Sequence, residues 1–93
     1  MKLKRQKLFD SLVKVFNITD RYNVSINRLN DDETEICVNF ENKTFSDTSF
    51  YSKKLYELGF VQIEFGYDSV LFKIDYKDRT ASERLIQNGI LEY

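Results

Sequence analysis

The sequence has no histidine, no proline and no tryptophan, and it has one cysteine and three glycines. Without histidine, no side chain has an ordinary pKa near neutral pH, and a single Cys37 excludes an internal disulfide, a cysteine–histidine pair and a zinc cluster. The glycines stand apart from one another, so no glycine-rich loop can cradle a phosphate. These absences favour a protein that is not an enzyme and that carries no cofactor and no metal.

Long apolar runs are also missing, and nothing approaches the length of a membrane-spanning helix. The first 16 residues begin like a signal peptide, but Asp10 and Lys14 interrupt the apolar stretch and no small-residue cleavage site follows. A lone cysteine fits a reducing compartment. We therefore expect a soluble, cytoplasmic protein, and 93 residues with 42% hydrophobic content predict a single domain over residues 1–93.

The N-terminal segment predicts a helix over residues 3–16, because Leu8, Leu12 and Phe16 recur with the helical period. Asn17 is expected to end it, since asparagine tolerates the left-handed conformation of a helix cap.

Two further segments carry helix start and stop signals. The second helix is expected to begin after Ser46 or Asp47 and to end at Gly59, which suits a left-handed C-cap. The third is expected to open with a capping box from Thr80 to Glu83 and to close near Gly89.

Strands are predicted where apolar and polar residues alternate, which occurs in residues 22–27, 36–41, 61–65 and 70–76. The resulting order is α-β-β-α-β-β-α, in which each strand keeps one apolar face. This pattern predicts an α+β fold of two layers, a four-stranded, mainly antiparallel sheet with helices on one face. Cys37 is out of phase with Ile36 and Val38, so we expect its thiol on the face away from the helices.

An acidic stretch joins the first two predicted strands. An EF-hand loop would need a glycine that this stretch lacks, so we do not expect calcium there. A solvated turn and a docking surface for a basic partner both stay open. The predicted partner-binding residues combine these acids with the tip of the second hairpin: Asp31, Asp32, Glu33, Glu35, Glu41, Tyr67 and Asp68.

The first helix has the opposite charge. Most of its cations lie at the N-terminal end, where the helix dipole disfavours positive charge, so local stability does not explain them. A frayed, solvated terminus and a contact with phosphate both stay open. The predicted nucleic-acid-binding residues of this alternative are Lys2, Lys4, Arg5, Lys7 and Lys14.

No motif in the sequence identifies a family. In general profile, a small, histidine-free chain with an acidic patch and no catalytic set resembles the inhibitors that phages and mobile elements make against host enzymes, anti-CRISPR proteins among them. That resemblance implies a protein-binding inhibitor or regulator whose partner is a larger protein with a basic surface, for example a nucleic-acid enzyme. The alternative is a small nucleic-acid-binding regulator, and the oligomeric state stays open.

Overall fold

The structure, a computed structural model, describes residues 1–17, 23–40 and 47–93. Its helices and strands follow one another along the chain as β1 (Lys2–Leu3), α1 (Arg5–Phe16), β2 (Val24–Arg28), β3 (Glu33–Asn39), α2 (Thr48–Leu58), β4 (Val61–Phe65), β5 (Ser69–Asp75), α3 (Arg79–Gln87) and β6 (Leu91–Glu92).

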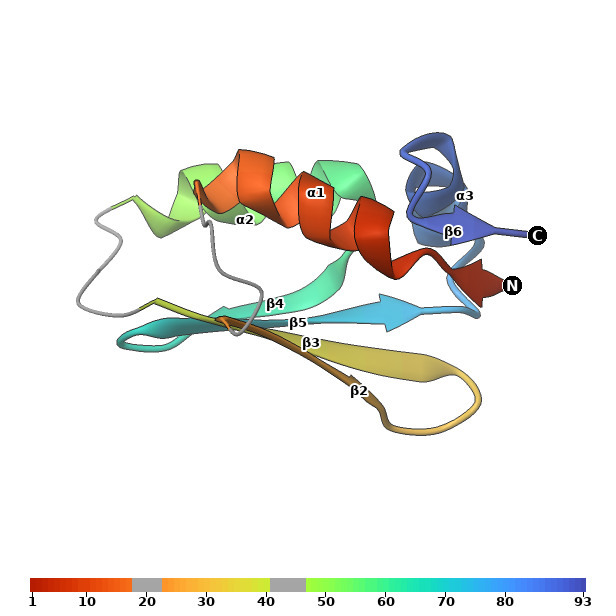
Figure 1. The fold of residues 1–93 in the computed structure, drawn as a ribbon, viewed down its shortest axis with the longest axis horizontal. Coiled ribbons are helices and arrows are strands. Elements are labelled where there is room, and N and C mark those ends of the chain that lie inside the picture. Colours follow the sequence, from red (N-terminus) through yellow and green to blue (C-terminus); the bar gives the residue numbers. More distant parts are fainter. Residues whose placement is uncertain (18–22, 41–46) are drawn as a thin grey trace.

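The main sheet is antiparallel and has the strand order β2-β3-β5-β4. Helices α1, α2 and α3 lie on one side of it and leave the opposite face uncovered (Figure 1). This arrangement confirms the predicted α+β fold and the order α-β-β-α-β-β-α for the longer elements. None of the helices in the described ranges is long and apolar enough to cross a membrane.

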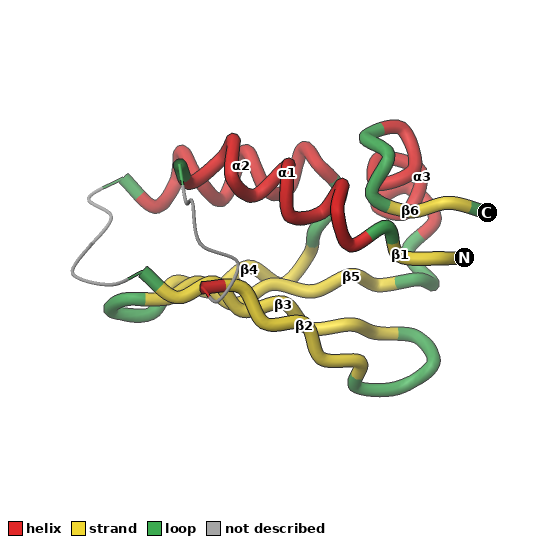
Figure 2. The backbone as a smooth tube through the Cα atoms, in the orientation of Figure 1, coloured by secondary structure: helices red, strands yellow, loops and turns green. Residues whose placement is uncertain are grey.

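A short two-stranded ribbon was not predicted. Strand β1 pairs with β6, and the Lys4 N–H donates to the Ile90 carbonyl at 2.8 Å, so the two ends of the chain lie side by side (Figure 2). Each of these strands has two residues, which is too short for an alternation to be seen. Helix α1 consequently begins at Arg5 rather than at Leu3.

The core lies between the helices and the inner face of the sheet. Leu8, Leu12 and Phe16 bury one stripe of α1, as their spacing predicted. Burial of each such side chain contributes roughly 1.5–3 kcal/mol. The sheet supplies alternate residues of its two central strands, and the fully buried ones are Ile36, Val38, Val70, Phe72 and Ile74.

The helix ends test the predicted caps. Asn17 is left-handed at the end of α1, Asp47 accepts from the Phe50 N–H, and Gly59 has φ +115° at the end of α2, all as predicted. The predicted capping box of the third helix is wrong.

Helix α3 begins earlier than its capping box predicted, because Asp78 is the N-cap and accepts from the Ala81 N–H at 3.0 Å. Thr80 lies inside the first turn, and Glu83 contacts Arg79 rather than the helix start. A carboxylate two residues upstream satisfies the free N–H groups more strongly than a threonine hydroxyl, which is why it sets the boundary.

Strand β4 is irregular. Val61 pairs with Lys73 and Glu64 pairs with Leu71, so two residues of β4 lie opposite Phe72 alone. The first of the two, Gln62, has φ +51°, which is the strained left-handed region for a residue with a side chain. The strand therefore contains a β-bulge at the sheet edge.

Candidate protein-binding surfaces

The predicted acidic turn is a structured hairpin tip. The Leu29 N–H donates to the Glu33 carbonyl at 3.0 Å, and the Asn30 side-chain oxygen accepts from the Asp32 N–H at 2.8 Å. Asparagine and aspartate favour such turns because their side chains bond to the backbone two residues on. The segment therefore forms the turn that the sequence predicted.

Each acid of this tip has a cation beside it. Arg28 lies 3.8 Å from the Asp31 carboxylate, the Lys77 ammonium lies 3.1 Å from Asp32, and the Lys73 ammonium lies 3.5 Å from Glu33. Lys73 and Lys77 come from β5 and the turn after it, far along the chain. Much of the charge that the sequence shows at this tip is therefore compensated within the fold.

The other predicted hairpin tip lies at the opposite end of the sheet. Ser69, next to this tip, pairs with Asn39, whereas Glu33 pairs with Asp75, so six residues of β3 separate the two ends. At the rise of an extended strand this is roughly 20 Å. Tyr67 is 85% exposed there, and it does not share a patch with Asp31 and Asp32. Glu41 lies outside the described residues.

The sheet face that the helices do not cover holds two of the predicted acids, Glu33 and Glu35. The strand register places alternate residues on this side, and we call them the open face. It holds four carboxylates and one ammonium, in a group composed of Ser25, Asn27, Glu33, Glu35, Cys37, Asn39, Val61, Glu64, Ser69, Leu71, Lys73 and Asp75.

The pKa of the Cys37 thiol shows that the centre of the open face is negatively charged. Burial raises the pKa of its thiol above the usual value, and the carboxylates of Glu35 and Asp68 raise it further. Glu35 belongs to β3 and Asp68 to the turn between β4 and β5, so two separate hairpins direct negative charge at one point. Cys37 is half-buried on this face and pairs with Ser25 and Leu71, which confirms its predicted side.

The cations of the first helix do not form one patch. Lys4 lies 3.1 Å from the Glu92 carboxylate, so its charge is compensated. Lys14 is in the last turn of α1, nine residues beyond Arg5 and roughly 14 Å along the axis. Lys7 contributes to a separate hollow near β6.

Lys2 and Arg5 instead share a hollow with Arg28 of β2. Sequence reasoning did not select Arg28 as a site residue. A signal was available, because Arg28 alternates in phase with Val24 and Ile26 and so had to lie on the helix side of the sheet.

Within residues 1–17, 23–40 and 47–93, no three acidic, histidine or cysteine side chains are grouped so that they could hold a metal ion. In comparisons with known proteins, the chain matches no family model, no curated protein and no solved structure.

Proposed function

We propose that the protein is a small, non-enzymatic protein-binding module, an inhibitor or regulator acting in the cytoplasm. Its open face would dock on a basic surface of a larger protein, such as one that binds nucleic acid. The observation that supports this proposal is the uncovered sheet face itself, with four carboxylates and one ammonium on a rigid antiparallel sheet.

The composition of the open face fits a binding surface. Cys37 and Leu71 are half-buried side chains on its two central strands, with Glu35 and Glu64 beside them. Interfaces commonly combine a less polar centre with a charged rim, and complementary charge speeds association and selects the partner. The strands also hold the backbone of these residues in place, so little backbone entropy is lost on binding.

Ion pairing divides the acids of these surfaces into two groups, and Glu64 joins the predicted residues here. Glu35, Glu64 and Asp68 have no ion pair among the described residues, whereas Asp31, Asp32 and Glu33 each have a cation nearby. We therefore expect the first group to carry the interaction. Tyr67 would act only at the rim, because it lies at one end of the sheet.

The test is affinity capture with two matched variants. One, the open-face variant, carries Glu35→Gln and Glu64→Gln on the open face and Asp68→Asn in the adjoining turn. The other carries Asp31→Asn and Asp32→Asn at the tip. We expect a partner to be retained by the wild type and the tip variant and lost by the open-face variant. Equal retention by all three would remove the open face from the proposal.

Titration with single- and double-stranded DNA and RNA distinguishes the proposed protein-binding function from the alternative, nucleic-acid binding. A nucleic-acid-binding regulator would bind with an affinity that falls steeply with salt, because phosphate contacts release counterions. That binding would be lost on Lys2→Ala, Arg5→Ala and Lys7→Ala substitution. Such a result would contradict the proposal and favour the basic surface.

A further inference from the structure

In the part of the chain that the structure describes, no strand lies at the outer edge of β2. Within the described residues, β2 pairs with β3 alone. In an antiparallel pair, every second residue bonds to the partner strand. The Leu29 N–H donates to the Glu33 carbonyl, so Asn27 and Ser25 also bond to β3. The backbone N–H and C=O groups of Ile26 and Arg28 therefore point toward the outer edge.

The hydrogen bonds between β3 and β5 support this assignment of the outward-pointing groups. The Tyr76 N–H donates to the Asp32 carbonyl and the Phe40 N–H donates to the Asp68 carbonyl, both across β3 and β5. Even-numbered residues of β3 therefore bond toward β5, and odd-numbered ones bond toward β2. Ile26 pairs with Ile36, an even-numbered residue, which leaves the backbone groups of Ile26 for the open edge.

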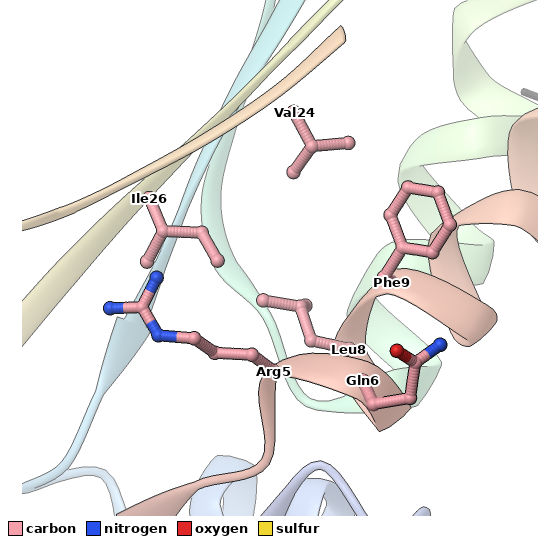
Figure 3. Close-up of a pocket in the computed structure, with 6 residues that line it drawn as sticks. All are labelled: Arg5, Gln6, Leu8, Phe9, Val24 and Ile26. Atoms are coloured by element: carbon pink, nitrogen blue, oxygen red, sulfur yellow. The ribbon is translucent and has the colours of Figure 1, made fainter. Parts of the chain in front are cut away.

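An apolar hollow of about 380 Å³ lies beside this edge, between α1 and β2. Val24 and Ile26 line it from the strand, while Leu8 and Phe9 line it from the helix, and the Arg5 side chain extends toward Ile26 (Figure 3). A strand added to β2 would point alternate side chains toward the helix layer, and hence into this hollow.

A second hollow of about 360 Å³ adjoins the first, because Arg5 and Ile26 line both. Three cations line it, Lys2 of β1, Arg5 of α1 and Arg28 of β2, and of these Arg28 also lies 3.8 Å from the Asp31 carboxylate. Its electrostatics are positive for two further reasons: α1 begins here without a side-chain cap, and its first turn contains no acid. No carboxylate of the described residues lies within ion-pair distance of Lys2 or Arg5.

We propose that an extended segment of another protein, with an apolar residue and an acidic residue two positions apart, adds to β2 as a fifth strand. Its backbone would pair with Ile26 and Arg28, its apolar side chain would enter the hollow between α1 and β2, and its carboxylate would lie among Lys2, Arg5 and Arg28. The two hollows suit this spacing, since residues two positions apart in a strand share a face and lie roughly 7 Å apart.

Charge complementarity selects this occupant over a second copy of the chain. Antiparallel pairing of two β2 strands about Ile26 would place Val24 of one copy opposite Arg28 of the other, so a second copy would bring no carboxylate to the cations of this hollow. The two hollows lie on the helix side of the sheet, opposite the open face, so this interaction goes beyond the proposed function.

The probe is a synthetic capped peptide with valine and glutamate on successive same-face positions and threonine between them. Its reverse sequence is included, since a strand can add in either direction. One control peptide has lysine for glutamate, and another has N-methylated backbone on the edge that would pair with β2. We expect the glutamate peptide to bind and to slow amide hydrogen exchange at Ile26 and Arg28, measured by NMR, and both controls to bind at least roughly tenfold more weakly.

Variants of the protein locate the site. Arg5→Glu with Arg28→Glu is expected to weaken the glutamate peptide roughly tenfold or more, whereas Arg79→Glu, an exposed arginine of α3, should leave its affinity unchanged. Amide spectra of each variant verify that the fold is kept.

Four outcomes would overturn the proposal. The first is that neither peptide direction binds at millimolar concentration. The second and third are that the lysine control or the N-methylated control binds as tightly as the glutamate peptide. The fourth is that the protein self-associates and that the Arg5→Glu, Arg28→Glu variant alters this self-association. The last outcome would assign the β2 edge to a second copy of the chain.

Discussion

The hydroxyl groups of Thr34 and Tyr76 lie 2.8 Å apart and join residues 42 positions apart in the sequence. Thr34 is a polar residue on the inner, helix-facing side of β3 and is only 2% exposed. Burial of a hydroxyl is tolerated when it has a partner, and Tyr76 is that partner.

Tyr76→Phe is therefore expected to lower the free energy of unfolding by about 1–2 kcal/mol, because the Thr34 hydroxyl is left buried without its bond. Adding Thr34→Val should recover part of that loss, since the unsatisfied group is then removed. Urea unfolding of the two single variants and the double variant measures the coupling. Losses that simply add would show that the two hydroxyls do not stabilise one another.

Gly59 is predicted to be intolerant of any side chain. Its φ of +115° favours glycine, and an added Cβ would lie 2.4 Å from the Ala81 carbonyl oxygen and 2.7 Å from Leu85 Cγ. Gly59→Ala combines backbone strain with a clash against α3, so we expect a loss of about 3 kcal/mol or more in the free energy of unfolding.

Gly89→Ala is the matched control for that substitution. Gly89 also has positive φ, at +76°, but its nearest contacts are Lys7 side-chain atoms at 3.9 Å. Only the backbone strain should remain, and a loss of about 1 kcal/mol is expected. Equal losses at the two glycines would indicate that the contact of Gly59 with α3 contributes nothing.

Asp78 and Thr80 distinguish two possible starts of α3. Because the Asp78 carboxylate caps the helix, Asp78→Ala is expected to lower the free energy of unfolding by about 1 kcal/mol. Thr80→Ala removes no cap and replaces threonine with a better helix former, so no loss is expected. Thermal or urea unfolding of both variants gives the comparison, and the reverse order of losses would reinstate the capping box.

The raised pKa of Cys37 predicts that the free energy of unfolding decreases at alkaline pH. Burial, Glu35 and Asp68 raise the pKa of its folded-state thiol, so the folded protein holds this proton more tightly than the unfolded chain does. The resulting stabilisation is complete below the ordinary thiol pKa and is lost as pH rises through the higher folded value. Cys37→Ser should remove this alkaline decline in the free energy of unfolding.

Alkylation of Cys37 provides a second measurement. The rate with iodoacetamide follows the thiolate, so its midpoint is expected above that of a free thiol. Glu35→Gln should shift the midpoint down, and more strongly at low salt, since one source of negative charge is removed. Asp75→Asn, on the same face but not among the groups that raise this pKa, should leave the midpoint in place.

The periodic parts of the fold were predictable because each long element has one buried face. Leu8, Leu12 and Phe16 identified α1, and the alternation through Ile36 and Val38 identified β3 and the side occupied by Cys37. The β1–β6 ribbon was not predictable, because two residues cannot show a period. The start of α3 was misread because two capping signals, at Asp78 and at Thr80, overlap.

The site was harder to predict because charge compensation depends on strand register. The sequence shows four acids close together at one hairpin, but Lys73 and Lys77 reach two of them from another part of the chain. Likewise, only the antiparallel order of β3, β5 and β4 places the turn of Tyr67 at the far end of the sheet. Local sequence determines the charges, and long-range pairing determines which of them meet.

Because of the bulge in β4, the two edges of the sheet differ in how well they can pair with a further strand. A flat sheet with two usable margins can copy its pairing from molecule to molecule and grow into a fibre. Here Gln62, with φ +51°, and its neighbour interrupt the regular spacing of β4, while β2 keeps a regular ladder. If a strand adds at β2, we therefore expect the assembly to stop there, because the bulged edge of β4 does not offer a regular second pairing site.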